Sequence, residues 1–114
     1  NQTQGGIIRG LGSALFEHLD LKGGKMRNGN FVDYKIPTSV DAPRMTTNFV
    51  ETPLPEGLYG ARGFGEHTMV PTAPAIANAI YNAIGVRIKD LPITAEKVLE
   101  AIRAKQAQRV AVKA

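Results

Sequence analysis

The feature that most constrains the fold is a glycine-rich segment with a helical apolar pattern, from Gly5 to Leu19. Ile7, Leu11 and Leu15 recur every four residues, as on one face of an α-helix. The glycines of this segment are Gly5, Gly6, Gly10 and Gly12. Each glycine costs a helix about 1 kcal/mol relative to alanine, so a helix that keeps them usually has another group close to its backbone. The sequence leaves open whether that group is a packed protein element or a ligand.

The middle of the chain has strand and turn character. Alternation from Phe31 to Ile36, ended by Pro37, predicts a half-buried strand. A threonine-rich second strand is expected over Met45 to Glu51. Turns are predicted at residues 22–25, which read Lys-Gly-Gly-Lys, and at Asn28-Gly29, a dipeptide typical of hairpins.

Two further helices are predicted in the second half of the chain. One runs from Val70 to Ile84 and ends at Gly85, where a C-terminal glycine belongs. The other follows Thr94, which is its expected N-cap, and loses its periodicity beyond residue 104. Residues 105–114 are therefore predicted to be a basic, flexible tail.

The predicted order of elements, helix, strand, strand, helix, helix, indicates an α+β fold with about three helices and a small antiparallel sheet. Two strands make a poor sheet by themselves. The chain also begins without an initiator methionine. We therefore expect it to be part of a longer protein that completes the sheet.

Composition excludes several classes of function. The chain has no cysteine, so it offers no disulfide, zinc thiolate or iron–sulfur ligand, and a cytoplasmic setting is expected. The net charge of +4 resides in residues 97–114, and residues 1–96 are balanced, which argues against nucleic-acid binding. We expect neither a signal peptide nor a membrane span, because no apolar run approaches about 20 residues.

One carboxylate is a candidate for chemistry. Glu66 follows a glycine-rich loop, with Gly63 and Gly65 on either side of Phe64, and precedes an alanine-rich helix. A carboxylate kept anionic by a helix N-terminus, yet desolvated, makes a good general base. On the residues alone, an ordinary acidic side chain near a helix start is the commoner interpretation. No metal-binding motif is present, because adjacent residues such as Glu66 and His67 diverge on a helix.

Four stretches of the sequence resemble one family of enzymes. They are "QTQGGIIRGLGSALFEHL" (2–19), "DYKIPT" (33–38), "GARGFGEHTMVPTAPAIANAIYNAIGVRIKDLPIT" (60–94) and "KVLEAI" (97–102). In this order they resemble the C-terminal end of the molybdopterin-binding subunit of xanthine dehydrogenase and aldehyde oxidoreductase-type molybdenum hydroxylases. The resemblance implies that residues 1–104 are the C-terminal portion of the molybdenum-cofactor-binding domain.

The resemblance also implies roles for single residues. The family's catalytic glutamate falls on Glu66, a general base in a hydroxylation that uses water as its oxygen source. Gln2, Gly5, Gly6 and Gly65 then lie beside the molybdenum-pterin cofactor. The pterin itself holds the metal, so no protein ligand to the metal is expected. The implied partners are the remainder of the subunit, FAD and 2Fe–2S subunits or domains, and a small-molecule substrate.

The sequence departs from the family pattern at Arg9, where glutamine is frequent, and at His67, where proline is usual. His67 is thus either a substrate-contacting or pH-tuning residue or a neutral replacement. Aldehydes, N-heterocycles and aromatic thioesters all remain possible substrates. We expect the isolated chain to be inactive and its exposed surface to favour self-association. The alternative is a non-catalytic assembly module that retains the family fold.

Overall fold

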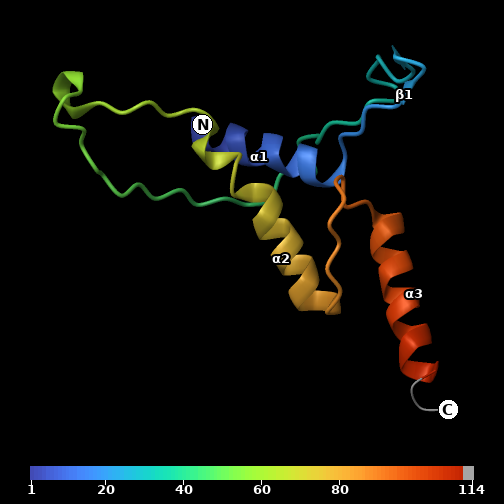
Figure 1. Cartoon of the computed structure of the whole chain (residues 1–114). Coiled ribbons are helices and arrows are strands. Elements are labelled where there is room, and N and C mark those ends of the chain that lie inside the picture. The colour runs from blue at the N-terminus through green and yellow to red at the C-terminus, as the bar shows by residue number, and fades with distance from the viewer. Residues whose placement is uncertain (112–114) are drawn as a thin grey trace.

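The computed structural model describes residues 1–111 and has the predicted α+β composition (Figure 1). The elements in chain order are α1 (Gln2–Leu15), β1 (Leu21–Lys22), β2 (Lys25–Met26), the 3₁₀ turns η1 (Leu58–Gly60) and η2 (Glu66–Thr68), α2 (Thr72–Ile84) and α3 (Ala95–Ala111). Helix α1 ends four residues before the predicted end at Leu19. The reason is that the N–H groups of Phe16 and Glu17 both donate to the carbonyl of Gly12, at 2.9 Å and 2.9 Å, which closes the helix.

Both predicted strands are wrong. Residues 31–34 form a turn, and residues 42–50 have no regular secondary structure. The turn forms because the side-chain oxygen of Asn30 accepts the N–H groups of Val32, at 2.9 Å, and Asp33, at 3.1 Å. Such local side-chain bonds compete with the ladder of a sheet.

The sheet instead comes from the predicted turn at residues 22–25. Leu21 pairs with Met26, and Lys22 with Lys25, in antiparallel register. Gly23 and Gly24 lie between the paired residues Lys22 and Lys25. Their φ values are 56° and 75°, respectively, which suit a tight hairpin turn.

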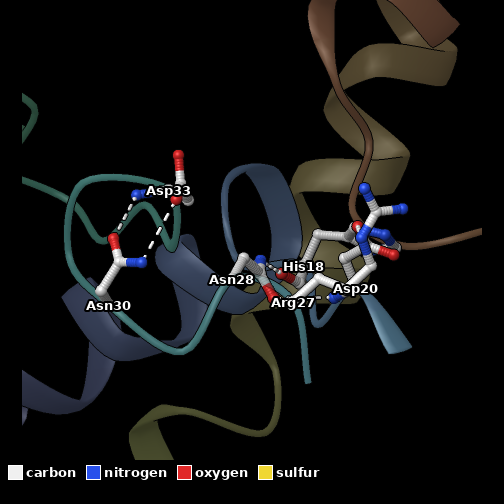
Figure 2. Close-up of polar contacts among 6 residues, drawn as sticks. All are labelled: His18, Asp20, Arg27, Asn28, Asn30 and Asp33. Carbon is white, nitrogen blue, oxygen red and sulfur yellow. Dashed lines mark hydrogen bonds and ion pairs between the residues drawn. The ribbon is translucent and has the colours of Figure 1, made fainter. Parts of the chain in front are cut away.

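The Asn28-Gly29 dipeptide does not form the hairpin turn that it predicts. The Asn28 side chain instead forms hydrogen bonds at the base of the hairpin (Figure 2). Its side-chain oxygen accepts the N–H of Asp20 at 2.9 Å, and its amide donates to the carbonyl of His18 at 2.6 Å. An ion pair of 3.7 Å between Arg27 and Asp20 lies beside these bonds.

The core lies at the C-terminal end of α1. Ala14 is 0% exposed and Ile93 is 2% exposed, and Pro92, next to Ile93, is buried too. The N–H of Ile93 donates to the carbonyl of Ala14 at 2.7 Å, so the segment before α3 is fixed along α1. On the same end of α1, Tyr34 donates to the carboxylate of Glu17 at 2.6 Å. This bond raises the pKa of Tyr34, because the ionised phenol could no longer donate it.

The C-terminal helices largely follow the prediction. Helix α2 begins at Thr72, two residues late, and ends at Gly85 in the left-handed region at φ 66°. Thr94 caps α3 as predicted, since its hydroxyl accepts the N–H of Lys97 at 3.4 Å. The predicted fraying from residue 105 is wrong as far as Ala111, because α3 continues to that residue; 112–114 lie outside the described residues. Within α3, Lys105 donates to the carbonyl of Ile84 at 2.5 Å and thereby links α3 to the end of α2.

The chain is extended, and its elements branch from α1 (Figure 1). The radius of gyration is 18.9 Å, whereas a compact chain of this length would have about 13 Å. The accessible surface is 9163 Å², against about 6,100 Å² for a compact protein of this mass. Large apolar side chains such as Phe31, Val40 and Leu58 are exposed. None of the helices within residues 1–111 has the length and apolar character to cross a membrane.

Substitution of the core residue Ile93 by alanine is expected to lower the free energy of unfolding by about 2–5 kcal/mol, because it leaves a cavity against α1. Both substitutions are compared in the isolated 114-residue chain, where Val40→Ala is the matched control: Val40 is 92% exposed there, so its replacement should change stability by less than about 0.5 kcal/mol. Urea unfolding of both variants measures the difference. Equal effects of the two substitutions would show that Ile93 is not part of a core.

Candidate functional site

The first half of α1 and the turn at residues 65–69 enclose a hollow of about 390 Å³. Its lining residues are Asn1, Gln2, Gly5, Gly6, Arg9, Gly65, Glu66 and Met69. All five residues that the family resemblance places at the site line this hollow, although they come from segments about 60 residues apart in sequence. The roles assigned to them individually stay predictions.

The glycines around the hollow differ in what they face. A Cβ atom added at Gly5 or Gly65 would meet nothing within 4 Å, so both leave open space. A Cβ added at Gly6 would lie 1.9 Å from the hydroxyl oxygen of Thr68, and one at Gly10 would lie 2.6 Å from the Cβ of Thr72. The open question about the glycine-rich helix is thus resolved in part: Gly6 and Gly10 accommodate a packed protein segment.

Glu66 opens the 3₁₀ turn η2 and lies six residues before the first residue of α2, not at the N-terminus of that helix. The prediction that a helix N-terminus polarises this carboxylate is therefore wrong, because α2 begins only at Thr72. The backbone carbonyl of Glu66 accepts the N–H groups of Met69, at 3.0 Å, and Val70, at 3.2 Å. The side chain is exposed. These bonds fix the backbone of the turn, and the carboxylate is left available to a group in the hollow.

His67 lines a different hollow from Glu66. This second hollow, of about 720 Å³, lies along the loop of residues 49–67 and includes Phe49 and Phe64. The rings of Phe49 and Phe64 meet edge to face, with centroids 5.8 Å apart, and the His67 ring stacks on Phe64 at 6.4 Å. His67 therefore lies with the aromatic residues of this loop and does not line the hollow of Glu66.

Arg62 has a structural role in the same loop. Its guanidinium donates to the hydroxyl of Thr52 at 2.9 Å and to the Thr52 carbonyl at 3.3 Å. This closes the base of the loop that carries Tyr59 and Gly60. Arg9 is the cationic side chain that lines the hollow of Glu66.

Comparison with known proteins assigns the chain to a family. A family model described as molybdopterin cofactor-binding domain matches residues 1–43. The putative xanthine dehydrogenase molybdenum-binding subunit of Escherichia coli K12 is 44% identical over 101 residues, which cover 87% of this chain and 13% of the relative. The chain belongs to the molybdenum-binding subunits of the xanthine dehydrogenase and aldehyde oxidoreductase family.

Other members of this family agree in sequence and in fold. The aldehyde oxidoreductase molybdenum-binding subunit of Escherichia coli K12 is 36% identical over 103 residues, or 88% of this chain and 14% of the relative. The crystal structure of quinoline 2-oxidoreductase from Pseudomonas putida 86 superposes with a TM-score of 0.81 at 31% identity, covering 90% of this chain and 14% of that one. The chain thus spans about one seventh of the length of the family members that it matches.

The residues around the hollow fit the pterin cofactor of the family. Gly5 and Gly65 leave the space that a bulky planar group needs, since nothing lies within 4 Å of either Cβ position. Gln2 brings an amide that can donate and accept hydrogen bonds. Residues 1–111 contain no cluster of His, Cys, Asp or Glu able to hold a metal ion.

Two features of the site escape sequence reasoning. Thr68 lies against Gly6 and Met69 lines the hollow, yet nothing local in the sequence distinguishes either residue. The available signal is the glycine spacing in α1, which indicates that another group packs closely against this helix but does not indicate which residue it is. The identity of that neighbour depends on the tertiary path of the chain.

Proposed function

We propose that this chain forms one wall of the cofactor site in a molybdenum hydroxylase and supplies its catalytic base, Glu66. The enzyme would use water to hydroxylate an aldehyde or an N-heterocyclic or other aromatic substrate. One observation carries the proposal: the hollow that contains Glu66 is the one bounded by Gln2, Gly5, Gly6 and Gly65. When bound, the molybdenum-pterin group would supply the redox chemistry that removes two electrons from the substrate.

The residues of this chain would bind the cofactor, hold the base and accept a proton. Gly5 and Gly65 would let the pterin approach the backbone, and Gln2 would hydrogen-bond to it. The Glu66 carboxylate would accept the proton of the water-derived nucleophile, which a general base must reach within about 2.6–3.2 Å or through one water. No hydrogen bond to this carboxylate is found within residues 1–111, so folding of this segment does not consume its acceptor capacity.

The proposal includes partners. The exposed apolar side chains of the segment, Phe31, Val40 and Leu58 among them, would pack against the remainder of the subunit. FAD and 2Fe–2S subunits or domains would carry the electrons away, in a cytoplasmic enzyme.

Glu66→Gln in the full-length enzyme is expected to lower kcat by about 10²–10⁴-fold, because the amide cannot take up the proton. The molybdenum content should stay at the wild-type level, since glutamine keeps the shape of the side chain. The matched control is His67→Gln, because His67 is the next residue and is equally exposed but lines the other hollow. Its kcat should stay within about threefold of wild type.

Steady-state oxidation with an artificial dye acceptor, combined with molybdenum analysis, measures both variants. Substantial turnover by Glu66→Gln would contradict the proposed role. It would favour the alternative, a non-catalytic assembly module of the same fold. A loss of kcat in His67→Gln as large as that in Glu66→Gln would show that the effect belongs to the turn and not to the carboxylate.

The isolated 114-residue polypeptide is expected to bind no molybdenum cofactor and to show no hydroxylase activity, because it would provide only one wall of the site. Purification after expression alone, followed by metal analysis and the dye-linked assay, tests this. Stoichiometric molybdenum together with turnover would contradict the expectation.

A further inference from the structure

Gly6 of α1 lies against Thr68, in the turn that carries Glu66. A methyl group at Gly6 would lie 1.9 Å from the Thr68 hydroxyl oxygen and 3.1 Å from its Cβ. Non-bonded heavy atoms do not approach to 1.9 Å. A side chain at residue 6 therefore requires the Thr68 side chain to rotate away or the turn and the helix to move apart.

Thr68 is linked rigidly to Glu66. Both belong to η2. The carbonyl of Thr68 accepts the hydroxyl of Thr72 at 2.8 Å, and the carbonyl of Glu66 accepts the N–H of Met69 at 3.0 Å. Because the turn is braced at both ends, a shift of Thr68 would move the backbone of Glu66 with it.

The contact is steric rather than polar. The hydroxyl oxygen of Thr68 is buried and has no hydrogen-bond partner within residues 1–111. A buried hydroxyl without a partner is unfavourable, so hydrogen bonding does not explain the placement of this side chain. A β-branched side chain has few rotamers and makes a stiff spacer.

A second contact, one helical turn further along α1, fixes the register. A Cβ added at Gly10 would lie 2.6 Å from the Cβ of Thr72 and 2.9 Å from the carbonyl oxygen of Met69. The segment from Thr68 to Thr72 thus contacts α1 at two points, Gly6 and Gly10. These two contacts fix its position along the helix axis and its distance from the helix.

We propose that the contact between Gly6 and Thr68 positions the Glu66 carboxylate in the hollow, so that both are positioning residues for the reaction. This inference rests on the proposed role of Glu66 as the base. It reassigns Gly6, which the family resemblance places beside the cofactor, to a contact within the protein. Gly5, which has open space before it, is left to face the pterin.

The test uses the full-length, cofactor-loaded enzyme. Gly6→Ala should lower kcat by about 10–100-fold, since a displacement of about 1 Å can cost 10²-fold in rate. Thr68→Ala should lower kcat only about threefold to tenfold, because it loosens the turn without pushing it. The double variant Gly6→Ala/Thr68→Ala should recover the kcat of Thr68→Ala, since the obstructing hydroxyl is gone. The mismatched pair Gly6→Ala/Thr72→Ala should not recover, because Thr72 faces Gly10.

A second comparison avoids the added methyl group and stays informative if Gly6→Ala does not fold. Thr68→Val keeps the branched shape but removes the hydroxyl, so its kcat should exceed that of Thr68→Ala and lie within about threefold of wild type. Values equal for Thr68→Val and Thr68→Ala would overturn a steric role.

A background that lacks the base separates positioning from cofactor binding. In Glu66→Gln enzyme, the addition of Gly6→Ala should leave the residual rate and the molybdenum content unchanged, because there is no base left to misplace. A further fall of either quantity would overturn the inference and indicate that Gly6 touches the cofactor. If Glu66→Gln inactivates the enzyme but Gly6→Ala does not, only the positioning inference fails; an active Glu66→Gln enzyme contradicts the proposed function itself.

Discussion

The close approach of the glycine face of α1 to the segment from Thr68 to Thr72 is the contact on which the site depends. Helix α1 could bring its backbone this near only by giving up side chains at Gly6 and Gly10. Each glycine lowers the stability of the helix by about 1 kcal/mol relative to alanine, but its missing side chain allows the two segments to pack at a short, fixed distance. The two segments together line the hollow, α1 with Gln2 and Gly5 and the turn with Glu66.

The same helix organises the rest of the chain. Ala14 and Ile93 form the small core at its C-terminal end, and Gly12 lies near enough to Pro37 that a Cβ would come within 2.8 Å of that ring. The hairpin, the loop of residues 42–65 and α3 extend outward from this centre (Figure 1). A segment built in this way has a defined site but little buried apolar surface, which is the condition expected of one wall of a larger domain.

Local signals in the sequence predicted the local structure well. Apolar periodicity located all three helices, Gly85 marked the end of α2, and the glycine pair at 23–24 marked a turn, although the hairpin was expected at Asn28-Gly29. The strands failed because alternation cannot reveal that Asn30 would bond its own neighbours, or that residues 45–51 lack a strand to pair with. The predicted end of α3, at residue 104, was too early, because an exposed helix can continue without an apolar face and α3 extends to Ala111.

The site was predictable only in part, for a physical reason. A carboxylate behind a glycine loop is common, so residue chemistry alone did not single out Glu66; the family resemblance did. That resemblance named residues from two distant segments, and the fold brings them to one hollow. Thr68 could not be foreseen, because its importance lies in what it touches across the fold.

The most direct measurement is an experimental structure of the full-length enzyme with its cofactor and a substrate analogue. The account predicts that the Glu66 carboxylate faces the cofactor at hydrogen-bonding distance, or through one water, with Gly5 and Gly65 against the pterin. A structure in which Glu66 points away from the cofactor and another carboxylate takes its place would contradict it.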